Sequence, residues 1–207
     1  MGRTAVKEKL NMKKTKTLRM AQLGLLIAII LVMAFTPLGY FRAAGLEITL
    51  LMIPVTVGAI VLGPKAGAIL GLTFGLTSFA IAPSSTFGAT LINISVVKTF
   101  VLCVVARLVA GWMAGITFKV LDKINFKYKF EVSSLLGPLY NTLFFMGTLV
   151  GFFYNTDYIQ QMATVLGTAN PITFVVAFVG IQGLVEAVVC FIIAGIVSKS
   201  LYKVVNK

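Results

Sequence analysis

Six apolar runs occupy most of the 207-residue chain and leave few folds open to it. They cover residues 19–36, 47–62, 65–82, 89–119, 133–154 and 172–200. A helix needs about 20 mainly apolar residues to cross the hydrocarbon core of a bilayer, and these runs approach or exceed that length. The second and third runs are separated only by Gly63, Pro64 and Lys65. Because helices usually end before a proline, we expect a tight helical hairpin there, within an all-α membrane protein that is a bundle of six transmembrane helices.

Composition and charge agree with this reading. The mean hydropathy is +0.99 and only 12% of the residues are charged, against roughly 25% in soluble domains. With the N-terminus inside, fifteen Lys and Arg residues fall on the cytoplasmic side, Arg42 falls outside, and Lys98 and Arg107 fall within a span. This is the asymmetry of the positive-inside rule. Both termini are therefore predicted to be cytoplasmic. The basic residues behind the net charge of +12 are expected to flank the membrane spans and not to bind a nucleic acid.

The chain is expected to have two parts. Residues 1–18 form a basic cytoplasmic tail, and residues 19–207 form the six-helix transmembrane domain. The N-terminus resembles a signal peptide in its basic segment and apolar run, but it lacks an A-x-A-like cleavage site and more apolar runs follow. We therefore expect a retained first helix in a multi-pass cell-membrane protein.

Glycine recurs at a spacing of four in the third run, at Gly63, Gly67, Gly71 and Gly75. In water each glycine inside a helix costs about 1 kcal/mol relative to alanine. In lipid, small residues four apart let two helix backbones approach closely. The repeat therefore predicts a groove that receives a neighbouring helix of the same bundle.

The first run carries a similar stripe of small residues, Ala21, Gly24 and Ala28, on a face without polar side chains. Such a face can pack against another helix of the bundle or against a separate membrane protein. We expect the second case for this helix, and we take these three residues as candidates for partner docking.

Three ionisable residues, Lys98, Arg107 and Glu186, lie within the predicted spans. Each costs roughly 2.5–3.5 kcal/mol at the centre of a membrane helix, so each should face the bundle interior. Counted along continuous helices, Lys98 and Arg107 bracket Glu186 in depth. The most plausible structural ion pair is Arg107 with Glu186, which leaves Lys98, about one turn below Asn93, to bind a ligand carboxylate. A purely structural role for Lys98 is the alternative.

Two amides, Asn141 and Gln182, also fall in the outer half of the predicted bundle. Thr73, Thr77 and Tyr140 fall at similar depth. A polar side chain within the membrane either bridges two helices or lines a wet cavity. Because several converge, we expect a cavity that opens through the outside loops, with Asn141 and Gln182 as candidate ligand contacts.

Several function classes are disfavoured. The chain has no histidine, and Cys103 and Cys190 lie in apolar runs, so neither a metal site nor a disulfide is expected. It contains no G-x-x-x-x-G-K-[ST] phosphate loop and no H-E-x-x-H or G-x-S-x-G motif. We therefore expect no catalytic residues, no cofactor and no ATP hydrolysis by this chain itself.

The runs "AQLGLLIAIILVMAF", "TPLGY" and "ITLLMIPVTVGAIVLGPKAGAILGLTFGL" carry a family resemblance. The chain resembles the substrate-binding S component of an energy-coupling factor (ECF) vitamin transporter, by motif over about the first 80 residues and by layout beyond them. The resemblance implies an importer subunit of a prokaryotic plasma membrane. Such a subunit captures a small-molecule vitamin from outside and delivers it through a transmembrane coupling subunit and two ABC ATPases.

Among these S components the chain is most similar to those specific for pantothenate. Members specific for pyridoxine or hydroxymethylpyrimidine are alternatives. A stand-alone secondary transporter is a further alternative, in which Lys98, Arg107 and Glu186 would form a relay. The last alternative is a membrane enzyme or assembly scaffold, which would bind no vitamin tightly.

The resemblance also implies site residues. In the family an alanine-x-x-x-alanine patch on the first helix contacts the coupling subunit, and Gly24 and Ala28 stand at the matching positions. The pocket is implied to lie under the first, third and fifth loops, "TPLGYFRAAGLE", "PSSTFG" and "YNTDYIQQ". This adds four candidate substrate contacts: Tyr40, Arg42, Tyr154 and Asn155. An anionic vitamin agrees with Lys98 and Arg42, because a desolvated carboxylate needs a compensating cation.

Overall fold

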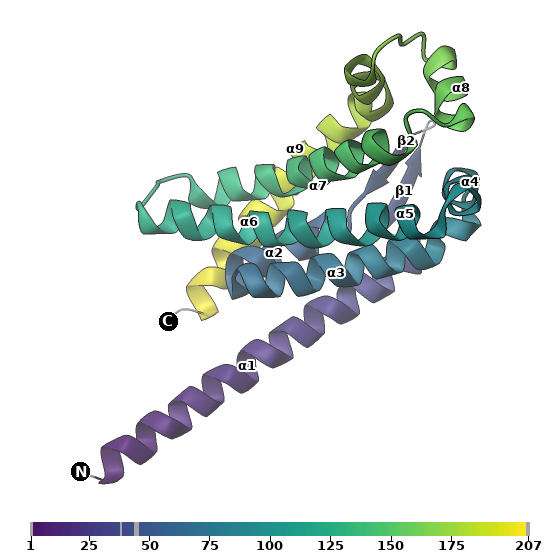
Figure 1. Cartoon of the computed structure of the whole chain (residues 1–207). Helices are drawn as coiled ribbons and strands as arrows, with labels where there is room; N and C mark the ends of the chain where they lie inside the picture. Colours follow the sequence, from purple (N-terminus) through teal and green to yellow (C-terminus); the bar gives the residue numbers. More distant parts are fainter. Residues whose placement is uncertain (1, 38, 44–45, 206–207) are drawn as a thin grey trace.

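The computed structural model describes the backbone of residues 2–37, 39–43 and 46–205, and within these the side chains of 16–37, 49–180 and 183–203. Helices dominate the fold (Figure 1). They are α1 (Gly2–Ala34), α2 (Met52–Leu62), α3 (Pro64–Ile81), α4 (Thr86–Ile94), α5 (Val96–Phe100), α6 (Ala106–Lys123), α7 (Lys129–Phe153), α8 (Asp157–Val165) and α9 (Pro171–Val205). A 3-10 turn, η1 (Ala82–Ser84), precedes α4, and a π-helical turn, η2 (Val101–Val105), joins α5 to α6.

Within the described part of the chain, five helical segments are long and apolar enough to cross a membrane. They are residues 16–34, 64–84, 96–123, 129–153 and 183–203. The apolar helix α2 has 11 residues, which at about 1.5 Å per residue is roughly half of the hydrocarbon thickness. These segments agree with the predicted membrane protein, while six spans and cytoplasmic termini stay predictions.

One feature departs from the all-α prediction. Strands β1 (Tyr40–Ala43) and β2 (Leu46–Thr49) form an antiparallel hairpin in which Tyr40 is opposite Thr49. The second apolar run therefore does not begin as a helix at residue 47. It begins as a strand, and the helix starts only at Met52.

Two further runs are interrupted where the sequence predicts continuous helices. The fourth breaks at Ser95, whose backbone is extended (φ −165°, ψ 112°) and whose hydroxyl accepts from the backbone N–H of Lys98 as a helix cap. The sixth breaks at Gly180 (φ 41°, ψ −136°), a conformation that side-chain-bearing residues rarely adopt. Helix α9 is therefore two helical pieces that meet at Gly180.

The bundle has two distinct ends (Figure 1). The hairpin, α4 and α8 gather at one end, which we call the hairpin end. The connection between α6 and α7 lies at the opposite end, and the C-terminus also lies toward it (Figure 1). The charge distribution predicts that the hairpin end faces outside.

The glycine repeat forms an internal seam, as predicted. Gly67, Gly71 and Gly75 of α3 face the backbone of α6 and η2. A Cβ added to Gly75 would lie 2.7 Å from the Cα of Val104, and one added to Gly71 would lie 2.9 Å from the carbonyl carbon of Arg107. Gly63 has another role, because it forms the turn between α2 and α3 with φ 97°. The predicted helical hairpin at Gly63–Lys65 is confirmed.

Replacing Gly71 by alanine is expected to lower the free energy of unfolding by about 1–3 kcal/mol. The added methyl group would meet the backbone of Arg107 and Leu108, which cannot rotate away as a side chain can. Thermal unfolding of the purified protein in detergent measures the effect. Gly147→Ala is the matched control, because nothing lies within 4 Å of the Cβ position at Gly147. Equal melting temperatures for the two variants would contradict the seam.

The opposite end is held by an aromatic cluster. The rings of Phe118, Phe130 and Tyr202 lie with centroids 5.1–5.4 Å apart and join α6, α7 and α9. Asp122 binds the ammonium group of Lys129 at 2.5 Å and accepts a hydrogen bond from the Tyr202 hydroxyl at 3.4 Å. This packing ties the three helices together far from the hairpin end.

Candidate ligand-binding site

A cavity of about 390 Å³ lies toward the hairpin end. Its lining residues come from β2, from α3 and η1, and from the elements between α4 and α9. Its volume is within the range of about 300–1,000 Å³ that is typical of small-molecule sites. The cavity therefore suits a ligand of the size of a small metabolite.

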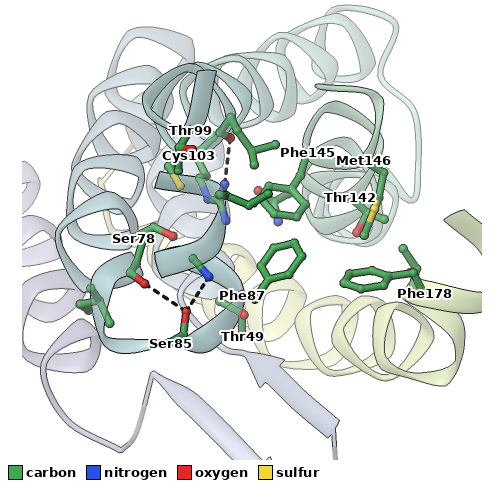
Figure 2. Close-up of a pocket in the computed structure, with 18 of the residues that line it drawn as sticks. Thr49, Ser78, Ser85, Phe87, Thr99, Cys103, Thr142, Phe145, Met146 and Phe178 are labelled. Atoms are coloured by element: carbon green, nitrogen blue, oxygen red, sulfur yellow. Dashed lines mark hydrogen bonds between the residues drawn. The ribbon is translucent and has the colours of Figure 1, made fainter. Parts of the chain in front are cut away.

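Much of the wall is aromatic. Phe87 of α4, Phe145 of α7 and Phe178 of α9 converge on one space, with Thr142 and Met146 beside them (Figure 2). The ring centroids of Phe87 and Phe178 are 5.7 Å apart. Such rings offer large apolar contact area and can stack on a flat or branched apolar part of a ligand.

Arg107 brings a positive charge to this cavity. It is 9% exposed, and its Nη1 donates to the carbonyl of Leu102 at 3.1 Å, within the π-helical turn. Its guanidinium carbon lies 4.5 Å from the ring centroid of Phe145 and 5.2 Å from that of Phe74. Stacking on two rings orients the planar guanidinium while leaving it among the lining groups.

Asn141 adds an unsatisfied polar group. It is 8% exposed and lines the cavity, and among the residues that the structure describes its Oδ1 has no hydrogen-bond partner. Leaving a buried acceptor unmatched costs about 1–3 kcal/mol, so native proteins rarely do so without a ligand or water at the site. Asn141 therefore brings an amide with spare hydrogen-bonding capacity to the cavity wall.

Glu186 brings a carboxylate to the same cavity. It is 9% exposed, and its Oε1 accepts a hydrogen bond from the backbone N–H of Thr49 at 2.6 Å. Thr49 is the last residue of β2 and lines the cavity as well. The bond therefore joins the hairpin to α9 at the cavity wall.

A tight turn shapes the cavity beside α4. The Ser85 hydroxyl accepts from the backbone N–H of Gly88 at 3.0 Å and donates to the carbonyl of Ala82 at 3.2 Å (Figure 2). A Cβ at position 88 would lie 2.8 Å from the Cα of Ala82, so only glycine fits there. This turn brings Ser85 and Phe87 into the lining together.

The structure brings together three of the predicted site residues. Asn141, Arg107 and Glu186 all line the cavity. The Arg107–Glu186 ion pair remains a prediction.

Lys98 and Asn93, the predicted carboxylate site, lie elsewhere. Both are exposed and neither is among the lining residues. The break at Ser95 lies between the two residues, so Asn93 belongs to α4 and Lys98 to α5 and they do not share one continuous helix.

The remaining predicted contacts fall outside the cavity lining or outside the described side chains. Tyr154 is half-buried and packs on Phe174, with ring centroids 6.1 Å apart, and Asn155 is exposed. The side chains of Tyr40, Arg42 and Gln182 lie outside the described residues.

Sequence reasoning missed the aromatic wall. Phe145 and Phe178 are apolar residues in apolar runs, and nothing local distinguishes them from lipid-facing residues. Phe87 is different, because it lies in the loop "PSSTFG" that was already expected to border the pocket. Among the described residues, no group of three or more His, Cys, Asp or Glu side chains could hold a metal ion.

The small-residue stripe of α1 faces away from the bundle. Ala21, Gly24 and Ala28 are exposed, and nothing lies within 4 Å of the Cβ position at Gly24. The opposite side of α1 packs inward through Ile30 and Ala34. A second membrane helix could therefore approach the stripe closely.

Comparison with known protein families gives a match over most of the chain. The family model described as "ECF transporter, substrate-specific component" matches residues 18–198. No curated protein matches the chain significantly.

Proposed function

Because the chain belongs to the ECF transporter substrate-specific component family, we propose that the cavity at its hairpin end binds the transported substrate and that this substrate is the vitamin pantothenate. The protein is then a membrane-embedded transporter subunit, not an enzyme, that captures the vitamin from outside.

The observation that carries the proposal is the presence of Arg107 and Asn141 in one aromatic-walled cavity. Pantothenate has a carboxylate, an amide, two hydroxyl groups and a branched apolar centre. Arg107 supplies the cation that a desolvated carboxylate needs, and the Asn141 Oδ1 accepts from the ligand amide. The apolar centre packs on Phe87, Phe145 and Phe178.

This proposal assigns the carboxylate to Arg107 in place of Lys98. Arg107 lines the cavity and Lys98 does not. The loop residues Tyr40, Arg42, Tyr154 and Asn155, and Gln182, remain proposed contacts at the mouth of the site, where they would close over the bound vitamin.

Pyridoxine and hydroxymethylpyrimidine are the alternative substrates. Their rings would stack on the phenylalanines, and their hydroxymethyl groups would donate to Glu186. Neither has a carboxylate for Arg107, which is why pantothenate is preferred. A stand-alone secondary transporter is less well supported, because Lys98 does not line the cavity that holds Arg107 and Glu186.

For delivery we propose that the exposed stripe Ala21, Gly24 and Ala28 docks on the transmembrane coupling subunit, which two ABC ATPases drive. The exposure of all three residues supports this assignment.

Isothermal titration of the purified protein with a panel of B vitamins tests the substrate. Pantothenate is expected to bind at least about 100-fold more tightly than pyridoxine or hydroxymethylpyrimidine. That ratio corresponds to about 2.7 kcal/mol, the scale of one charge-assisted contact made by pantothenate alone. Tightest binding of another vitamin would reassign the substrate, and no binding of any vitamin would contradict the proposed function.

A further inference from the structure

We propose that Glu186 is the latch that holds the β1–β2 hairpin against the ligand cavity. The inference rests on the proposed function only in taking the cavity as the substrate site. Glu186 is then a positioning residue for the hairpin, whether or not it also contacts the ligand.

The first support is the bond itself. The Thr49 N–H donates to Glu186 Oε1 at 2.6 Å across a sequence separation of 137 residues. A carboxylate acceptor makes this bond about twice as strong as a bond between neutral groups. Burial of Glu186 shields the bond from competing water.

The second support is where the bond lies in the hairpin. Thr49 is the partner of Tyr40 in the strand register, and the next residue closes the base of the hairpin, because the N–H of Leu50 donates to the carbonyl of Gly39 at 3.0 Å. The Leu50–Gly39 bond thus closes the base of the hairpin, and the neighbouring Thr49–Glu186 bond links that base to α9. Loss of the Glu186 carboxylate would remove this link between the hairpin and α9 while leaving the Leu50–Gly39 bond in place.

The third support is the shared cavity. Thr49 and Glu186 both line it, so the latch is part of the wall that a ligand contacts. A bound ligand would exclude water from the latch and strengthen it, because hydrogen bonds are stronger where the local dielectric is low. Conversely, loss of the latch would let the hairpin move and the ligand leave faster.

Hydrogen–deuterium exchange of the ligand-free protein in detergent tests the latch directly. In Glu186→Ala, peptides covering residues 46–51 are expected to exchange at least about tenfold faster than in the unmodified protein, a factor that corresponds to about 1.4 kcal/mol. Glu186→Gln keeps an uncharged acceptor and is expected to give an intermediate rate. If the alanine variant does not fold, the glutamine variant decides. Unchanged exchange in residues 46–51 would overturn the proposal.

Glu131→Gln is the matched control. Glu131 lies on α7 and pairs with Lys199 at 3.5 Å, and it does not line the cavity. Its substitution should leave exchange of residues 46–51 unchanged. An equal increase in both glutamine variants would show general loosening of the bundle and would overturn the latch.

Dissociation of radiolabelled pantothenate provides the second measurement. The dissociation rate is expected to rise in the order unmodified, Glu186→Gln and Glu186→Ala, together with hairpin exchange. Faster dissociation without faster exchange would make Glu186 a ligand contact alone and would overturn the latch. If the unmodified protein binds no pantothenate, the proposed substrate fails, while the exchange experiment still decides the latch.

Discussion

Arg107→Ala is expected to weaken pantothenate binding at least about 30-fold. Removing one partner of a buried charged pair costs about 2 kcal/mol or more, and each 1.4 kcal/mol or so is a factor of ten in affinity. Among the described residues, the cavity that the ligand carboxylate enters is also lined by Glu186, an acidic residue that cannot replace the lost cation. Isothermal titration measures the change, and Arg107→Lys should recover only part of it, because an ammonium group lacks the planar fork that binds a carboxylate through two hydrogen bonds.

Lys98→Ala is the control that separates the two candidate cations. Lys98 is exposed and lies outside the cavity lining, so its substitution is expected to change the affinity less than threefold. The sequence alone predicts the reverse, a loss of at least about tenfold at Lys98, on the scale of one charged hydrogen bond. A large effect at Lys98 with a small one at Arg107 would return the carboxylate to Lys98.

The double substitution Gly24→Leu and Ala28→Leu is expected to abolish uptake while leaving pantothenate affinity unchanged. Two bulky side chains would fill the stripe on α1 and hold a partner helix away from its backbone. Nothing lies near the Cβ position at Gly24, so the fold itself can accept the change. Uptake is measured in proteoliposomes that also contain the coupling subunit and both ATPases, and affinity is measured on the isolated chain.

Gly147→Leu is the matched control for that experiment. It also adds a large side chain at an open glycine, in α7 and away from the stripe. Normal uptake by this variant, together with loss of uptake by the double variant, supports docking at α1. Normal uptake by the double variant would place the docking surface elsewhere, and uptake without any ATPase would favour a secondary transporter.

The parts of the fold that were predictable are those where the membrane restricts the choice of residue. Glycines at a spacing of four predicted the α3 seam because close backbone approach needs small residues. The sequence Gly63–Pro64 predicted the turn between α2 and α3 because helices usually end before a proline, and glycine can adopt the positive φ of 97° found at this turn. Arg107 and Glu186 were expected inside the bundle because lipid penalises charge, and they are buried.

The parts that were missed depend on contacts between distant residues or on a local cap within an apolar run. Nothing in "LINISVVKTF" requires a break, yet the Ser95 hydroxyl caps a new helix there. That break places Asn93 and Lys98, which were predicted to form one site, on different helices. The strand Leu46–Thr49 pairs with β1, and its last residue donates a hydrogen bond to Glu186. Neither contact can be predicted from the apolar pattern of the surrounding sequence.

The seam between α3 and α6 has a mechanical consequence. Where two backbones touch, no layer of side chains is left that could change rotamer and let one helix slide along the other, so α3 and α6 are expected to behave as a single rigid plate. Arg107 is part of that plate, because its own main chain abuts Gly71. If the cavity binds the substrate as proposed, we expect the hairpin, α8 and the piece of α9 before Gly180 to move during binding and release, while Arg107 stays fixed against α3.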